Sequence, residues 1–259
     1  MDMYFPFGQT VKRVYQTNKE EKEFFILGVY ASAVHAKWIK DDKLICRALA
    51  VASEPRIFWD GNKEEAQRII DNISIPKEVG SLVLPESKYN GPSGRVLDSH
   101  ILKPLSINRD DVWLCDMLPE CRLNANQIER ISKSYNPLIQ SNDLNEVTVP
   151  SVPTNSNGFC DENRCLEIIE EIKESKAKKL ILLGDKPIQQ FLNKVSDTKY
   201  KGLREWVSKF GYATPVKTTI GDFEIDVIAM AHPRQIGGLG ESKISFAELH
   251  REWENKMFK

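Results

Sequence analysis

The sequence lacks three features that would point directly to a membrane protein, a secreted protein or a nucleic-acid-binding protein. No apolar run approaches the roughly 20 residues that span a bilayer, so we expect no transmembrane helix and no membrane partner. The start, Met1-Asp2-Met3-Tyr4-Phe5-Pro6, has neither region of a secretory signal, and we expect a cytoplasmic protein. The net charge is only −1. Binding to nucleic acid would therefore need a local positive surface.

Cysteine is also scarce and poorly arranged for metal binding. There are five cysteines, an odd number without a secretion signal, so we expect reduced thiols. Cys160 and Cys165 lie close in sequence, but no second pair stands at metal-ligand spacing. The sequence therefore predicts no metal site.

The chain does contain apolar runs that alternate with amphipathic segments over its 259 residues. We predict strands at about 24–29, 44–52, 111–118 and 179–183, and a hairpin of 216–220 with 223–231. Helices are expected at about 64–73, 92–102, 126–134, 162–176, 203–210 and 245–257. This alternation predicts an α/β fold whose mostly parallel sheet has helices on both faces.

The domain prediction is a single domain over 1–259. We expect residues 1–22 to form an N-terminal extension across the surface, and 53–90 and 139–160 to be irregular excursions. The long 139–160 connection is either a functional loop or a plain surface excursion.

Polar residues follow three of the predicted strands. A buried strand at 24–29 delivers a loop from Tyr30 to His35, Asp116 lies near the end of the third strand, and His232 follows the last. Ligands of open α/β sheets bind at the carboxyl ends of the strands. We therefore expect these groups to line one pocket. Taken alone, a histidine at a strand end is more often structural than catalytic, and the alternative role of Asp116 is a cap on a backbone turn.

A helix start at Gly91-Pro92-Ser93-Gly94 is the remaining candidate. Glycine, proline and serine before an apolar periodic run are typical of a helix N-terminus, where unpaired N–H groups suit a phosphate. An ordinary capped helix explains the pattern as well.

Five segments in order resemble the uracil-DNA glycosylase superfamily, most closely its iron–sulfur microbial branches, over roughly residues 24–250. They are Leu27-Gly28-x-x-x-Ser32, Gly91-Pro92-Ser93-Gly94-Arg95-x-Leu97-Asp98, Asp111-Val112-Trp113-x-Cys115-Asp116-x-x-x-x-Cys121-Arg122, Leu182-Leu183-Gly184-Asp185 and Ala231-His232-Pro233. The resemblance implies a three-layer α/β/α fold with a central four-stranded parallel sheet. It also implies a monomer that binds DNA, flips a base into a pocket and cleaves its N-glycosidic bond.

The resemblance also implies roles for individual residues. His232 matches the histidine that stabilises the departing base, and Tyr89 the aromatic that stacks on it. Asp116 falls where the family has an asparagine that reads the base edge. The DNA-contacting positions are Ser93 at the helix start and Arg234, Gln235 and Ile236 in the loop that enters the duplex; the pocket loop supplies Gly28, Val29, Tyr30, Ser32 and His35.

The sequence departs from the family at two functional points. The residues that normally place the attacking water are replaced by Val29 and Tyr30, and the usual proline is Ala31. The water must then be held by Asp116, backbone groups, Tyr30, Ser32 or His35, with Asp185 a weaker candidate. Only Cys121 matches a cluster cysteine, whereas an iron–sulfur cluster needs four thiolates, so we predict no cofactor.

The carboxyl at Asp116 changes the hydrogen-bond pattern that the pocket would read. A protonated carboxyl donates once and accepts once, which matches the amino group and ring nitrogen of cytosine. Burial in an apolar pocket favours that protonated form. We therefore predict excision of a modified cytosine, enlarged at C5, from foreign DNA, and hence a role in antiviral defence.

Three other functions stay open at this stage. They are a catalytically inactive, nucleic-acid-binding member of the fold, a conventional uracil-DNA glycosylase, and a nucleotide-binding α/β enzyme that uses the Gly91–Gly94 helix start. The last lacks both the P-loop and the spaced three-glycine fingerprint.

Overall fold

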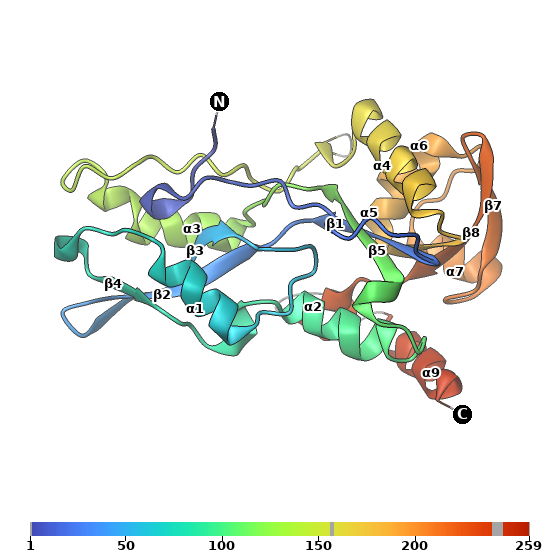
Figure 1. The fold of residues 1–259 in the computed structure, drawn as a ribbon, viewed down its shortest axis with the longest axis horizontal. Coiled ribbons are helices and arrows are strands. Elements are labelled where there is room, and N and C mark those ends of the chain that lie inside the picture. Colours follow the sequence, from blue (N-terminus) through green and yellow to red (C-terminus); the bar gives the residue numbers. More distant parts are fainter. Residues whose placement is uncertain (1, 156–157, 240–245, 259) are drawn as a thin grey trace. The chain divides into compact units, whose positions relative to one another are not determined.

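A computed structural model describes residues 2–155, 158–239 and 246–258 of the chain (Figure 1). The described residues divide into two compact units that alternate along the sequence. Unit 1 comprises Met1–Val14, Ala31–Pro92 and Glu120–Val152, and unit 2 comprises Tyr15–Tyr30, Ser93–Pro119 and Pro153–Lys259. Folding of 1–259 as one domain stays a prediction.

Unit 2 contains the mostly parallel sheet that the sequence predicts. Its five strands lie in the order β5 (Val112–Leu118), β1 (Phe24–Tyr30), β6 (Lys179–Leu183), β8 (Phe223–Met230) and β7 (Val216–Ile220). The first four are parallel, and β7 pairs antiparallel with β8. The α/β class is confirmed. The sheet has five strands instead of four because the predicted hairpin adds β7 at the edge.

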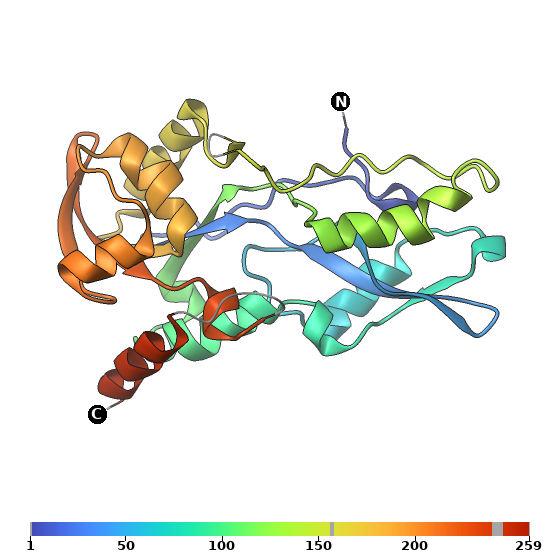
Figure 2. The ribbon, with the colours of Figure 1, turned by 180° about the vertical axis from the view of Figure 1, so that it is seen from behind.

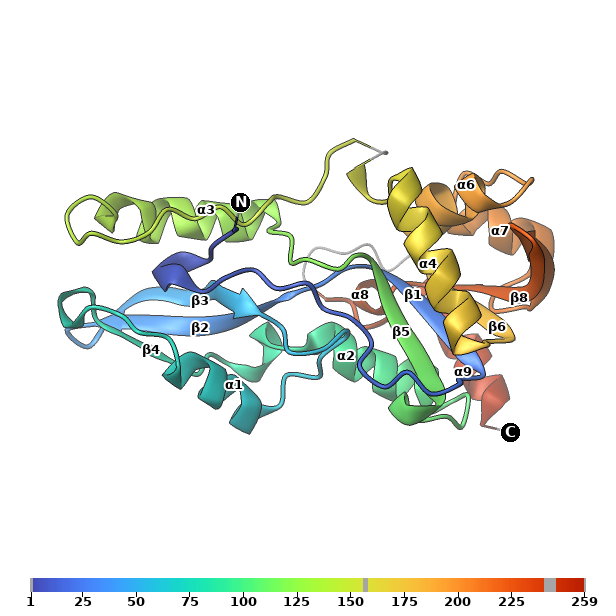
Figure 3. The ribbon, with the colours of Figure 1, turned by 45° about the horizontal axis from the view of Figure 1, so that its top comes forward.

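The helices predicted in unit 2 at 92–102, 162–176 and 203–210 lie where the sequence predicts them. All eleven residues from 92 to 102 are helical: α2 (Pro92–Val96) continues directly into a π-helical turn (Leu97–Leu102). The others are α4 (Glu162–Ser175), α5 (Asp185–Pro187), α6 (Asn193–Val195), α7 (Leu203–Phe210), α8 (Pro233–Ile236) and α9 (Ala247–Met257). Helix α4 lies alongside β5 (Figure 3), and α7 packs on β8. The predicted start of the last helix at Ser245 lies outside the described residues.

Unit 1 contains a second sheet that the sequence analysis misses. Strands β3 (Lys43–Ser53), β2 (Ala33–Lys40) and β4 (Ser81–Val83) form an antiparallel sheet in that order, with α1 (Lys63–Asp71) and α3 (Ala125–Ser134) beside it (Figure 2). The predicted strand at 44–52 exists, but its place in a parallel sheet is wrong. The turn between β2 and β3 has positive φ at both Asp41 and Asp42, as a type I′ hairpin turn requires.

Two further expectations need correction in unit 1. The N-terminal extension does not simply cross the surface, because Phe5 and Phe7 are buried in the core and Phe7 packs edge-on against Trp38 and Tyr135. The 53–90 segment is not an irregular excursion, since it holds α1 and β4. The described part of 139–160 has no α-helix or sheet strand, as predicted.

No helix among the described residues is both long and apolar enough to cross a bilayer.

Candidate functional site

The carboxyl ends of the parallel strands in unit 2 bring together Gly28, Val29 and Asp116. Strands β1 and β5 pair in register with Gly28 opposite Asp116, so β1 places no side chain next to the carboxyl at that position. Asp116 is only 3% exposed. Burial raises the pKa of its carboxyl to about 7, although the charge of Arg164 and a hydrogen bond from the Val29 backbone act in the opposite direction. Near neutral pH this carboxyl is therefore protonated in a large fraction of molecules.

A buried arginine on α4 fixes the strand that carries this carboxyl. The guanidinium of Arg164 donates to the carbonyl oxygens of Asp116, at 2.8 Å, and Met117, at 3.2 Å. Its charge is balanced by Glu167 at 2.8 Å and Glu171 at 3.0 Å. Because a buried charge needs both counter-charge and hydrogen bonds, this network holds the backbone at Asp116 in one position.

The second group of the candidate site is His232, which directly follows β8. It is the N-cap of α8, and its Nδ1 accepts a hydrogen bond from the backbone N–H of Arg234 at 3.2 Å. Burial, with a smaller contribution from the charge of Arg234, lowers the pKa of His232 to about 4. The neutral ring therefore carries its proton on Nε2, where it is a hydrogen-bond donor.

Asp116 is on β5 and His232 follows β8, and strands β1 and β6 lie between these two strands in the sheet. The carboxyl of Asp116 reaches the β1 backbone at Val29, whereas the Cβ of His232 lies 3.2 Å from the position that a Cβ on Gly184, directly after β6, would occupy. Strands β1 and β6 are adjacent. Adjacent strands are about 4.8 Å apart, so the two side chains reach toward this pair of strands from opposite sides.

A chain of buried hydrogen bonds supports the peptide that precedes His232. The backbone N–H of Ala231 donates to the hydroxyl of Tyr212 at 3.0 Å, and this hydroxyl lies 2.6 Å from Nδ1 of His250. Nε2 of His250 lies 2.8 Å from the carbonyl oxygen of His100. The carbonyl oxygen of His100 can only accept, so Nε2 of His250 carries the proton and donates to it. Nδ1 of the neutral ring then accepts from the hydroxyl of Tyr212, which itself accepts from the N–H of Ala231.

The other predicted site residues of unit 2 lie on several separate helices and strands. Val29 and Tyr30 are half-buried at the end of β1, and Ser93 lies in α2. Arg234, Gln235 and Ile236 form α8 and are not an extended loop; the side chain of Gln235 caps that helix at the backbone of His232. Asp185 caps α7 through the N–H of Leu203 at 2.8 Å, which identifies a structural role for its carboxylate.

Three predicted pocket residues, Ser32, His35 and Tyr89, belong to unit 1. His35 does not lie in a loop, because β2 begins at Ala33; its Nε2 lies 2.9 Å from the Gln127 amide nitrogen. Burial, together with the charge of Arg130, lowers the pKa of His35 to about 4. Tyr89 ends a short 3₁₀ helix and is half-buried.

Sequence reasoning missed Glu54, Arg164, Tyr212 and His250. Glu54 is buried beyond the end of β3, and its carboxylate accepts from the backbone N–H of Ser32 at 3.0 Å. A carboxylate after an apolar run was the signal used for Asp116, and the same signal marks Glu54. Arg164 gives no comparable signal, because a charged residue near a helix N-terminus is ordinary in sequence.

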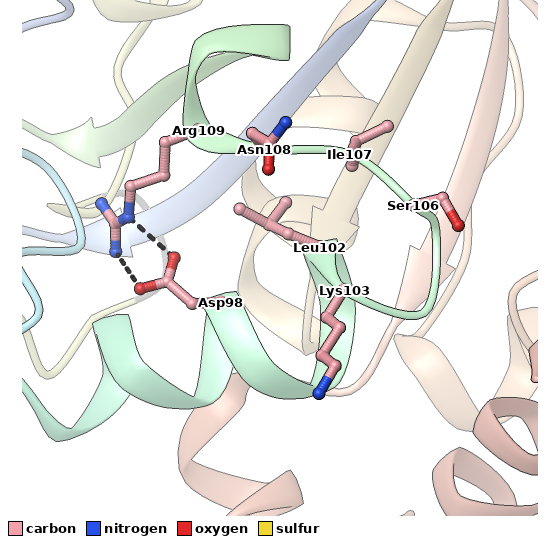
Figure 4. Close-up of a pocket in the computed structure, with 7 residues that line it drawn as sticks. All are labelled: Asp98, Leu102, Lys103, Ser106, Ile107, Asn108 and Arg109. Atoms are coloured by element: carbon pink, nitrogen blue, oxygen red, sulfur yellow. Dashed lines mark hydrogen bonds and ion pairs between the residues drawn. The ribbon is translucent and has the colours of Figure 1, made fainter.

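A cavity of about 490 Å³ lies elsewhere in unit 2, where the π-helical turn of residues 97–102 meets the following loop (Figure 4). Its lining contains Asp98 and Arg109, which pair through two contacts of 2.7 and 3.2 Å. None of the predicted site residues lines this cavity. We assign it no role in the candidate site.

Within the ranges that the structure describes, no three His, Cys, Asp or Glu side chains are grouped to hold a metal ion. Comparison with protein-family models gives no match, and neither does a search of curated proteins, so a functional assignment depends on the residues themselves.

Proposed function

We propose that the chain is a DNA glycosylase of the uracil-DNA glycosylase type that excises a modified, cytosine-type base from foreign DNA. It would act as a cytoplasmic monomer on a flipped nucleotide. The observation that carries this proposal is that the carboxyl end of one sheet holds both a buried carboxyl, Asp116, and a neutral Nε2–H donor, His232.

The bond to be broken defines what these residues must do. Cleavage of an N-glycosidic bond leaves positive charge on the sugar and negative charge on the departing base. The Nε2–H of His232 would donate to the O2 of the base and stabilise that negative charge, as a preorganised donor does in an oxyanion hole. Because the pKa of His232 is lowered to about 4, the ring stays neutral and keeps a single, defined donor.

Asp116 would select the base. The amino group, N3 and O2 of cytosine lie in a row on one edge, so His232 at O2 leaves the amino group and N3 to the carboxyl of Asp116. A protonated Asp116 accepts from the amino group and donates to N3, whereas an ionised one repels the N3 lone pair. Gly28, opposite Asp116, adds no side chain to this part of the site. Flipping the nucleotide exposes this edge to the protein.

Water must then attack the sugar cation. Asp185 is occupied as a helix cap, and Val29 has no polar side chain. Within unit 2, Tyr30 and the backbone at the end of β1 are the groups that we propose for holding this water. As the water bonds to the sugar carbon, its proton passes to the departed base anion. A sugar cation is a reactive electrophile, so placement of the water matters more than early removal of this proton.

The proposal is tested by base release. Duplexes that contain uracil, cytosine, 5-methylcytosine or 5-hydroxymethylcytosine are incubated with the protein, and abasic sites are scored by alkaline cleavage. We expect release of a modified cytosine and not of uracil. Robust uracil release without release of any modified cytosine contradicts the assigned base and favours a conventional uracil-DNA glycosylase.

The second candidate is a DNA-binding protein without catalysis. The observation that favours it is the absence of an acidic or amide side chain at Val29, Tyr30 and Ala31. DNA binding in a gel-shift experiment, with no abasic site on any duplex of the panel, would support this candidate over the enzyme.

A further inference from the structure

Two cationic side chains of unit 1 lie over the ring of Tyr89, and two more lie near Glu86, three residues before it. The Nζ of Lys88 lies 5.2 Å and the guanidinium carbon of Arg130 lies 5.9 Å from the centre of the Tyr89 ring. Lys37 on β2 and Arg47 on β3 are close enough to add to the effect of Lys88 in lowering the pKa of Glu86. We call Lys37, Arg47, Lys88 and Arg130 the Tyr89 cation cluster.

The cluster has little internal compensation for its charge. Glu86 pairs with Lys88 at 2.7 Å, and no ion pair joins Lys37, Arg47 or Arg130 to a carboxylate of the described chain. The pKa of Glu129 is lowered by its pair with Lys133, at 2.5 Å, and to a smaller extent by Arg130. With both pairs counted, the region has a net charge of +3 in a protein whose total is −1. A local excess of this kind attracts polyanions although the whole protein is nearly neutral.

The cluster is accessible and partly fixed in position. Arg47 and Lys88 are exposed, and Lys37, Tyr89 and Arg130 are half-buried. The guanidinium of Arg130 donates to the carbonyl oxygen of Ala48 at 3.3 Å, which holds it near the ring. Its other N–H groups take no part in that bond and can donate to an oxygen of a ligand.

We propose that the Tyr89 cation cluster binds the sugar–phosphate backbone of DNA. Cations at several positions match the repeated charge of a phosphodiester chain, and an aromatic ring beside them is typical of surfaces that bind nucleic-acid strands without sequence preference. The choice of DNA as the polyanion rests on the proposed function. The surface itself rests on the charges, exposure and ring contacts of unit 1.

The test is the salt dependence of DNA binding by the full chain. The dissociation constant for a fluorescent duplex of unmodified DNA, which offers no base to excise, is measured between about 50 and 200 mM salt. The double variant Lys37→Gln/Arg47→Gln loses two cluster charges. Its matched control is Lys63→Gln/Arg68→Gln, which removes two exposed charges from α1 of the same unit.

We expect the cluster variant to lose about 1.8 from the slope of log K against log salt, since each phosphate contact contributes about 0.9. Binding at the lowest salt should weaken about tenfold or more, and the control should match the wild type. An unchanged slope in the cluster variant, an equal loss in the control, or tighter binding of RNA than of DNA overturns the proposal.

Base release by the same proteins separates this inference from the proposed function. A reduced slope without any base release keeps the surface and overturns the enzyme. Base release with an unchanged slope keeps the enzyme and overturns the surface. Circular dichroism of all variants confirms that the surface substitutions leave the fold intact.

Discussion

The backbone N–H of Arg234 donates to Nδ1 of His232, 3.2 Å away, so the hydrogen bond that caps α8 also fixes the tautomer of the imidazole. A histidine at an N-cap needs an unprotonated ring nitrogen to accept this hydrogen bond. The lowered pKa, about 4, keeps that nitrogen unprotonated at any pH at which the protein would work. The fold thereby fixes Nε2–H as the donor that the proposed chemistry requires.

Substitutions can separate the roles of the two ring nitrogens of His232, one as the acceptor that caps α8 and the other as the proposed donor to the base. His232→Asn keeps a side-chain acceptor for the Arg234 N–H but has no donor at the position of Nε2. We expect base release by this variant to fall by about 10²–10³-fold, the usual loss of one preorganised donor, with little change in melting temperature.

His232→Gln is the matched control, because its amide nitrogen can occupy the position of Nε2 while the cap is weakened. We expect this variant to melt at a lower temperature and to retain more base release than His232→Asn. The reverse order of the two activities would show that the cap, and not the donor, is what the reaction needs.

Asp116 should make base release depend on pH. Burial raises the pKa of its carboxyl to about 7, and only the protonated form donates to N3 of a cytosine. We expect kcat/KM for base release to decrease as the pH rises through about 7. In Asp116→Asn, whose amide both donates and accepts at every pH, this decrease should be absent. A decrease that persists in Asp116→Asn would assign it to another group.

The raised pKa of Asp116 also predicts how the stability of the fold depends on pH. The pKa in the folded protein, about 7, lies above the ordinary value of 3.8, so the folded state binds the extra proton between these two pH values. Stability contributed by this group therefore falls as the pH rises from about 4 to 7 and stays low above that range. Asp116→Asn should melt at a higher temperature than the wild type at pH 8, and the difference should shrink at pH 4.

The sequence predicted the fold of unit 2 well because its strands are continuous apolar runs. Strand β6 and the β7–β8 hairpin lie where those runs lie, and the turn between β7 and β8 contains Gly221 at a φ of 58°. Such a turn residue is a strong local signal. Asp116 and His232 could be identified for the same reason, as polar residues that follow apolar strands.

Unit 1 was poorly predicted because its signals are not local. The turn between β2 and β3 uses Asp41 and Asp42 at positive φ without a glycine, so the hairpin gives no recognisable turn pattern. Its core depends on distant contacts, since the Tyr135 hydroxyl accepts from the backbone N–H of Phe7, 128 residues earlier. Spacing along the chain cannot indicate such pairs.

Arg164 should contribute both to stability and to the acidity of Asp116. In Arg164→Met the carboxylate of Glu171, which is largely buried, and the carbonyl oxygens of Asp116 and Met117 lose their partner. We expect a loss of about 3 kcal/mol or more in the free energy of unfolding. Because the arginine charge lowers the pKa of Asp116, the pH at which base release declines should also move upward.

Lys173→Met is the matched control for Arg164→Met on the same helix. Lys173 pairs with Asp222 at 3.0 Å, but both side chains are substantially exposed, so its removal should destabilise the protein far less than removal of Arg164. Chemical denaturation measures both variants. Similar losses in the two would contradict the structural role that we assign to the buried guanidinium.

The absence of a side chain at Gly184, directly after β6, should be needed to hold His232 in its position. It has a φ of 87°, and a Cβ added there would lie 3.2 Å from Cβ of His232. Gly184→Ala should therefore be destabilised by about 1–3 kcal/mol through backbone strain and should also displace the imidazole. Gly221→Ala is the matched control, since its φ is 58° but no atom lies within 4 Å of the added Cβ. At a temperature where both variants are folded, Gly184→Ala should lose base release and Gly221→Ala should keep it, because only the first substitution moves the proposed donor. Equal base release by the two variants would mean that the contact with Gly184 does not set the position of His232.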